Sequence, residues 1–195
     1  MLTHVNKRHR LEPTAAALAL LRREGPAALT MRNVAGEAGV TATALYRHFE
    51  DKRELLRAVV REVYAVFRHH LTGELPADSD AALSVACDRY LRFARSHPNY
   101  YRLLFAEAHE IGIDRYPEDF QSGRSPTFRA LKSLVARCMA DGVLSPGNEA
   151  DIALTLYAHM HGLVMLHLAG RFHHNETLFE RFYHDSIGRL IGGLR

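Results

Sequence analysis

The sequence predicts an all-α protein, and three observations lead to this prediction. Apolar residues recur three or four positions apart along most of the 195 residues, and no segment keeps the alternation of a half-buried strand. Gly and Pro residues interrupt this pattern at intervals that suit helices of ordinary length. The 47% hydrophobic and 24% charged residues are typical of a globular chain and argue against a disordered one.

The first predicted helix covers residues 13–24. Pro13 is tolerated in a first turn, and Gly25 followed by Pro26 ends the helix. Two short helices should follow. Thr30 is the expected N-cap of one that stops at Gly39.

Thr41 is the expected cap of the next helix, over 41–48. Helices of about eight residues do not persist alone in water, so these two must pack on each other and on their neighbours. A helix-turn-helix unit provides that packing.

A long fourth helix begins at the D-x-x-E pattern of Asp51 and Glu54, and the segment 72–79 interrupts it. We therefore predict an N-terminal three-helix helix-turn-helix domain, residues 1–56, joined to a C-terminal helical bundle, residues 57–195. The bundle helices are expected at about 79–96, 98–110, 126–141, 149–171 and 175–193. Residues 111–125 form the longest stretch without helical periodicity.

Charge is unevenly distributed along the chain. Residues 1–60 contain ten Lys and Arg against six Asp and Glu, a balance of +4, whereas the remaining residues balance to −1. This asymmetry favours a polyanion-binding head on a neutral body, with a merely solvated basic face as the alternative.

The predicted helix over 41–48 has two different faces. Leu45 lies on an apolar face, opposite a small and polar face. That polar face carries Ala42, Thr43, Tyr46 and Arg47. Small residues near a helix N-terminus let the backbone come close to DNA, and donors further along reach bases and phosphates.

The start of the fourth helix supports the same interpretation. Lys52 and Arg53 lie in a first turn, where the helix dipole disfavours cations. An anion reverses this penalty, and a DNA phosphate is the natural candidate.

These segments closely resemble the N-terminal domain of TetR-type transcriptional repressors. The resemblance spans residues 11–60 and includes Leu29-Thr-Met-Arg32, Val34-Ala35, Ala38-Gly-Val-Thr41, Leu45-Tyr-Arg-His-Phe49, Lys52 and Leu55-Leu56. It implies a homodimeric DNA-binding regulator whose last two helices dimerise and whose C-terminal part holds an inducer pocket. Double-stranded DNA and a small molecule are the implied partners.

The resemblance also implies roles for individual residues. Phosphate contacts are expected from Thr30, Tyr46, His48 and Lys52, and groove-facing or base-reading positions are Thr41, Ala42, Thr43 and Arg47. Arg32, in the second helix, completes the candidate DNA-binding set.

A ligand pocket between bundle helices is a further candidate site. Its mostly apolar lining would be typical of a small-molecule site and favours an apolar or aromatic inducer. The candidate lining residues are Phe93, Tyr101, Leu104, Phe105, Phe128, Met139, Tyr157, His161 and Met165.

Other functions find less support in the sequence. It has no G-x-S-x-G, P-loop, H-E-x-x-H or Rossmann pattern, so we predict no enzyme activity and no cofactor, with a histidine-dependent enzyme as a remote alternative. None of the 13 histidines forms an H-x-x-x-H pair, and we interpret Glu180 and His184 as a surface pair one turn apart, so no metal site is predicted. A DNA-architectural or interaction module without an inducer is the nearer alternative.

The chain is also expected to remain in the cytoplasm. No apolar run reaches the roughly 18 residues of a membrane span, and the first ten residues lack the apolar stretch of a secretory signal. Cys87 and Cys138 form no CxxC pair and are predicted to be reduced, small core residues.

Overall fold

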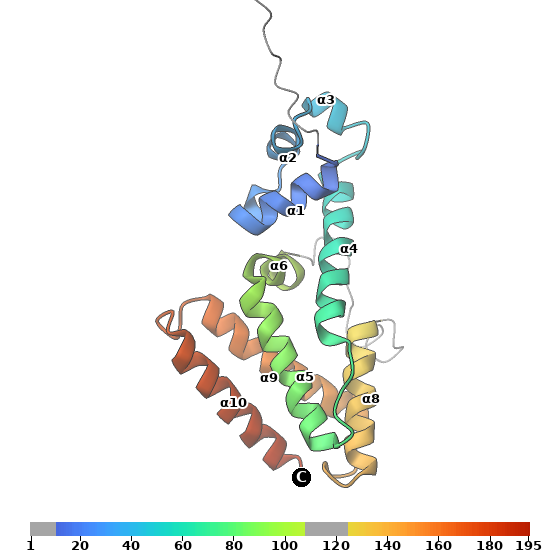
Figure 1. Ribbon diagram of the computed structural model, residues 1–195, viewed down its shortest axis with the longest axis vertical. Helices are drawn as coiled ribbons and strands as arrows, with labels where there is room; N and C mark the ends of the chain where they lie inside the picture. The colour runs from blue at the N-terminus through green and yellow to red at the C-terminus, as the bar shows by residue number, and fades with distance from the viewer. Residues whose placement is uncertain (1–10, 108–124) are drawn as a thin grey trace, which may run out of the picture. The chain divides into compact units, whose positions relative to one another are not determined.

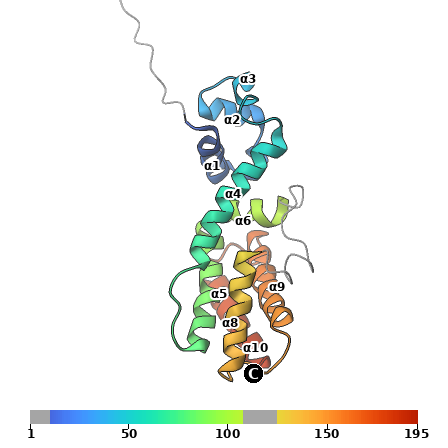
Figure 2. The ribbon, with the colours of Figure 1, turned by 90° about the vertical axis from the view of Figure 1, so that its right-hand side faces the viewer.

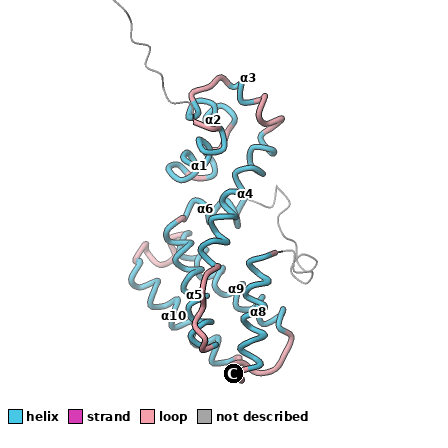
Figure 3. Tube along the Cα trace, turned by 45° about the vertical axis from the view of Figure 1, so that its right-hand side comes forward, coloured by secondary structure: helices cyan, strands magenta, loops and turns pink. Residues whose placement is uncertain are grey.

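The computed structural model describes residues 11–107 and 125–195, and within these ranges the regular structure is helical, without a strand (Figure 3). The all-α prediction is therefore confirmed. The chain divides into two compact units. Of the described residues, unit 1 contains 11–66 and 99–107, and unit 2 contains 67–98 and 125–195.

Unit 1 consists of short helices and the beginning of a long one (Figure 1). Its elements are α1 (Pro13–Glu24), a 3₁₀ turn (Pro26–Ala28), α2 (Met31–Ala38), α3 (Ala42–Leu45) and α4 (Lys52–Leu71) up to Val66. From Asn99 onward it also includes α6 (Pro98–Arg102) and the π-helical turn Leu103–Glu107. The division between the units falls within α4, between Val66 and Phe67, whereas the predicted domain boundary follows residue 56.

The predicted helix ends are present in unit 1. The Thr30 hydroxyl oxygen accepts a hydrogen bond from the Asn33 N–H at 3.1 Å, which caps α2. Gly39 closes α2 in the left-handed region at φ +70°, where a side chain would be strained. The Thr41 hydroxyl oxygen accepts from the Ala44 N–H at 3.1 Å and caps α3.

The third helix is shorter than the predicted range 41–48. The Tyr46 N–H still reaches the carbonyl of Ala42 at 3.0 Å. The N–H groups of Arg47 and His48 instead bond to carbonyls three residues back, at 3.2 and 2.9 Å. The α-helix thus tightens into a 3₁₀-like turn that carries the chain through His48.

Unit 1 encloses an apolar core between α1, α2, α3 and α4. Leu45 is fully buried and anchors α3 in this core, which fixes the opposite face of α3 outward. The other buried side chains are Ala16, Ala17, Leu20, Leu21, Leu29, Met31, Val34, Ala35, Ala38, Phe49, Leu55, Ala58, Val59, Val60 and Val63.

Unit 2 is a helical bundle (Figure 2). Its helices are α5 (Ser79–Ser96), α8 (Pro126–Ala140), α9 (Glu149–Leu168) and α10 (Glu176–Gly193). Helix α8 packs against α5 and α9, and α9 also packs against α5 and α10. The predicted bounds of α5 agree with the structure, and those of α8 and α10 differ by one residue.

Helix α9 ends at Leu168, before the predicted end at residue 171. Gly170 has φ +76°, and its N–H bonds to the His167 carbonyl at 2.8 Å. Gly170 thus leaves the right-handed helical region inside the predicted range, and His173 and His174 beyond it also have positive φ angles. Backbone geometry, which the apolar spacing does not report, therefore shortens the helix.

The predicted helix over 98–110 is described only in part. Helix α6 (Pro98–Arg102) passes into a π-helical turn at Leu103–Glu107. The rest of this prediction, and that of an irregular segment at 111–125 up to residue 124, lies outside the described residues.

The two cysteines are buried in unit 2, as predicted. Burial raises the pKa of the Cys87 thiol to about 12, and it also raises the pKa of Cys138. Among the residues that the structure describes, no helix is long and apolar enough to cross a membrane.

Candidate functional site

The outward face of α3 is exposed to solvent. Ala42 and Thr43 are exposed at the start of the helix, and Tyr46 exposes 53% of its surface, although it is a large aromatic residue. Arg47 and His48 are also exposed. None of these five side chains forms a hydrogen bond or ion pair with another described residue. The predicted polar face of α3 is therefore available to a partner.

The start of α4 is capped by two carboxylates. The Asp51 carboxylate accepts a hydrogen bond from the Glu54 N–H at 2.8 Å, and the Glu54 carboxylate accepts one from the Glu50 N–H at 2.6 Å. This arrangement resembles a capping box, except that the Glu54 carboxylate bonds to the N–H of Glu50, one residue before the N-cap Asp51. Lys52 is exposed in the same turn and has no ion pair within the described ranges. Arg53, in the same turn, is also exposed and forms no ion pair with a described residue. Both cations are therefore available to a phosphate.

The two other residues predicted to contact DNA lie at the start of α2. The hydroxyl oxygen of Thr30 is used in the cap, but the residue stays partly exposed. Arg32 is exposed in the first turn and is unpaired among the residues described here. Helices α2 and α3 pack on each other. The structure therefore brings the predicted residues of α2 and α3 onto neighbouring helices.

Arg23 differs from these cations because it is neutralised within unit 1. Its guanidinium group forms a two-pronged contact with Glu37, with N···O distances of 3.1 and 2.9 Å, and it also pairs with Glu24 at 2.9 Å. The hydrogen bonds from Arg23 hold the pKa of Glu37 below its usual value. This pair links α1 to α2 and leaves Arg23 little charge for a partner.

Three of the predicted pocket residues belong to one chain of aromatic rings in unit 2. Phe93 contacts Phe67 at a centroid distance of 4.8 Å, and Phe67 lies 6.0 Å from Tyr90. Tyr90 lies 6.1 Å from Tyr157, which stacks on His161 at 5.9 Å. Sequence reasoning missed Phe67 and Tyr90, since apolar spacing does not distinguish them from ordinary core residues.

His161 adds a polar group to this aromatic chain. Its Nδ1 lies 3.5 Å from the Tyr90 hydroxyl. Burial lowers the pKa of His161, so the ring is neutral at physiological pH. A neutral imidazole can donate or accept a hydrogen bond without a buried charge.

The other predicted pocket residues are distributed over both units. In unit 1, Tyr101 and Leu104 are buried, and the rings of Tyr101 and Phe105 lie 4.5 Å apart. In unit 2, Phe128 is buried, whereas Met139 and Met165 are half-buried.

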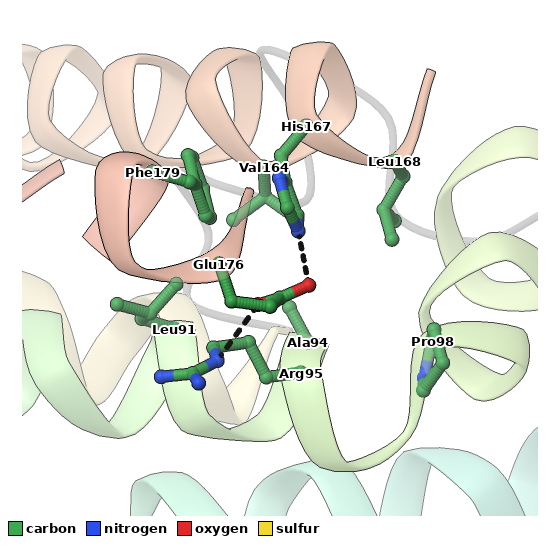
Figure 4. Close-up of a pocket in the computed structure, with 9 residues that line it drawn as sticks. All are labelled: Leu91, Ala94, Arg95, Pro98, Val164, His167, Leu168, Glu176 and Phe179. Carbon is green, nitrogen blue, oxygen red and sulfur yellow. Dashed lines mark hydrogen bonds and ion pairs between the residues drawn. The ribbon is translucent and has the colours of Figure 1, made fainter. Parts of the chain in front are cut away.

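A separate small pocket lies between α5, α9 and α10 (Figure 4). It has a volume of about 80 Å³, and it includes none of the predicted pocket residues. Nε2 of His167 lies 2.9 Å from Glu176 Oε1, and Arg95 Nε lies 3.2 Å from Glu176 Oε2. The His167 ring stacks on Phe179 at 4.0 Å. No local spacing in the sequence could have predicted this cluster, because its members come from three helices.

The predicted Glu180–His184 surface pair is not formed. Glu180 instead pairs with Arg95 at 2.9 Å, and His184 faces Asp88 at 3.9 Å. Partners from α5 are closer than the neighbour one turn away. Within the described part of the chain, no group of three or more His, Cys, Asp or Glu residues is arranged to hold a metal ion.

A capped pair of short helices with an open polar face, attached to a chain that continues into a helical bundle, defines the class of helix-turn-helix regulators. Comparisons with known proteins specify the family. Residues 14–59 match the family described as "Bacterial regulatory proteins, tetR family", and residues 83–190 match "Tetracyclin repressor-like, C-terminal domain".

Solved structures share the fold over nearly the whole chain. A Rhodococcus sp. RHA1 protein of unknown function is 22% identical, with a TM-score of 0.73, and the match covers 100% of this chain and 99% of that one. A TetR variant from Acinetobacter baumannii AYE in complex with minocycline is 22% identical, with a TM-score of 0.64 and 93% coverage of both chains. BioQ with its natural double-stranded DNA operator is 24% identical, with a TM-score of 0.63 and coverage of 93% and 94%.

The chain belongs to the tetR family of bacterial regulatory proteins. It is a transcriptional regulator, and its DNA-binding domain lies in the region matched at residues 14–59.

Proposed function

We propose that the protein is a ligand-responsive, homodimeric transcriptional repressor that binds a pseudo-palindromic operator through residues 41–48. The observation that carries this proposal is the exposed polar face of α3, which has a capped start and no side-chain partners among the described residues. Tyr46 lies on this face with 53% of its surface exposed, so its hydroxyl group is accessible to a phosphate.

The DNA contacts follow from the chemistry of this face. Ala42 and Thr43 are small, so the helix N-terminus can approach base edges in the major groove. Arg47 lies one turn further and can donate two hydrogen bonds to a guanine. Thr30, Tyr46, His48 and Lys52 would contact phosphates and fix the register of the protein on the duplex. BioQ, which shares this fold, is described in complex with its double-stranded DNA operator, and this supports DNA as the partner.

Dimerisation is proposed through the outward faces of α9 and α10. Leu166, Leu178 and Phe182 are exposed by 47%, 40% and 40%, although they are large apolar residues. Gly162 lies in α9, and a Cβ atom added there would meet no other atom within 4 Å. A second copy of this surface would bury the apolar side chains in a four-helix interface. A dimer would also place two α3 helices in successive major grooves, about 34 Å apart.

The ligand is proposed to bind in the bundle near the aromatic chain that includes Tyr157 and His161. Aromatic rings and a neutral imidazole suit an apolar or aromatic molecule with a hydrogen-bonding group. The minocycline complex of one relative supports a small-molecule site in this fold. Binding would favour the conformation in which the two α3 helices no longer match the operator spacing, which releases the DNA.

Selection of binding sequences from a random duplex pool tests the proposal. The purified protein at physiological salt should enrich a two-fold symmetric site, and a Tyr46→Phe/Lys52→Ala double variant should lose that enrichment. The Kd for the selected duplex then gives a direct assay for candidate inducers. A folded dimer that enriches no sequence would contradict the proposal.

A further inference from the structure

The C-terminal end of α1 has a backbone carbonyl that its own helix cannot satisfy. In a continuing α-helix the carbonyl of Arg22 would accept from the N–H of residue 26. That residue is Pro26, which has no N–H, and Gly25 has already turned the chain away at φ +87°. The side-chain amide of Asn99 supplies the donor instead, with its Nδ2 at 3.1 Å from the Arg22 carbonyl oxygen.

The Asn99 side chain is held in this orientation from its other end. Its Oδ1 accepts a hydrogen bond from Arg102 Nη1 at 2.9 Å, one turn further along α6. This bond assigns the oxygen and nitrogen of the amide, so that Nδ2 faces α1. The amide also packs closely against the end of α1, because a Cβ on Gly25 would lie 3.3 Å from Asn99 Oδ1.

Asn99 also lies at a joint in the chain. The first segment of unit 2 ends at Pro98, and the chain returns to unit 1 at Asn99. Helix α5 of unit 2 ends at Ser96, and the N–H of His97 still bonds to the Phe93 carbonyl at 2.9 Å. Only His97 and Pro98 separate α5 from Asn99, and proline restricts its own backbone angle. The connection from the end of α5 to the residue that holds α1 is therefore only two residues long, and one of them is a proline.

We propose that Asn99 is a positioning residue that couples the bundle to the DNA-binding helices. Through its hydrogen bond to the Arg22 carbonyl, it ties α1 to the point where the chain leaves α5. This inference rests on the proposed DNA-binding function, and it adds a specific contact within unit 1, at the residue where the chain enters that unit from α5. Loss of the contact leaves both units folded and the DNA-contacting side chains intact, but weakens the influence of one unit on the other.

Allosteric coupling is reciprocal, so it can be measured with DNA as the only ligand. The experiment compares backbone amide hydrogen exchange in residues 88–96 of α5 with and without the selected operator duplex. The wild-type protein should exchange these amides at least about fivefold more slowly when DNA is bound, the lower end of typical coupling. The variants are Asn99→Ala and Asn99→Asp. The second keeps the size of the side chain and an acceptor for Arg102, but removes the donor to Arg22.

Ser96→Ala is the matched control, since Ser96 is exposed near the same joint and makes no side-chain hydrogen bond to a described residue. Both Asn99 variants should still bind the duplex and show native circular dichroism, yet lose most of the DNA-dependent slowing. The control should retain it.

Three outcomes would overturn the inference. Full slowing in both variants would show that coupling does not pass through Asn99. Loss of folding or of all DNA binding in both would mean that Asn99 supports the structure of unit 1 rather than coupling. Wild-type protein that binds DNA without slowing in α5 would also contradict it, whereas wild-type protein that binds no duplex would refute the proposed function as well.

Discussion

Lys52 offers the sharpest test of the proposed DNA interface, because its charge is free to meet a phosphate. Each phosphate neutralised by a protein cation contributes about 0.9 to the slope of log K against log salt concentration. A dimer presents two copies of Lys52, so Lys52→Ala should reduce the slope by about 1.8. Raising the salt from 50 to 200 mM should therefore reduce the affinity of the wild type by a factor about twelve times larger than the factor for the variant.

The assay is fluorescence anisotropy with the selected duplex at several salt concentrations. Lys132→Ala is the matched control, since it removes the same charge from α8 in unit 2. The control slope should equal the wild-type slope. If Lys52→Ala also keeps that slope, the ammonium group does not contact a phosphate, and the docking of α3 and α4 on DNA is wrong.

Four further changes have defined outcomes. Gly36→Ala should raise the free energy of unfolding by about 1 kcal/mol in a urea titration, because Gly36 is exposed within α2 and an added Cβ meets nothing within 4 Å. Thr30→Ala should lower it by about 1 kcal/mol in the same titration through loss of the α2 cap. Phe182→Glu should weaken dimerisation about tenfold or more in sedimentation equilibrium, because a carboxylate would be buried in the proposed interface. The pKa of His161 is lowered by burial, so the unfolded chain takes up a proton first as the pH falls. Stability should therefore decline below about pH 6.5, and urea titrations of His161→Gln at several pH values should show a shallower decline.

Sequence patterns predicted the helices of this protein well where the information is local. Thr30 and Thr41 were recognisable as caps because a hydroxyl oxygen needs only an N–H three residues away. Gly39 was recognisable as a helix end because it alone tolerates the left-handed angle at low cost. The third helix was overestimated, since apolar spacing does not separate an α-helix from the 3₁₀-like turn that follows it.

The ligand region was less predictable, because its contacts join distant parts of the chain. Tyr157 and His161 are one turn apart, and their stacking could be anticipated. Their link through Tyr90 to Phe67 joins α9, α5 and α4, and no spacing rule specifies it. The side chain of Asn99 illustrates the same limit, since its partner Arg22 is 77 residues away.

Charge illustrates most clearly what the structure adds to the sequence. Arg23 and Lys52 count equally in the +4 balance of the first 60 residues. Arg23 lies between two carboxylates, whereas Lys52 has no ion pair in the described part of the chain. A charge count alone predicts that the loss of Arg23 and the loss of Lys52 would weaken DNA binding equally. The geometry instead assigns Arg23 to the link between α1 and α2 and leaves Lys52 for the phosphate, so only the loss of Lys52 should change the salt dependence.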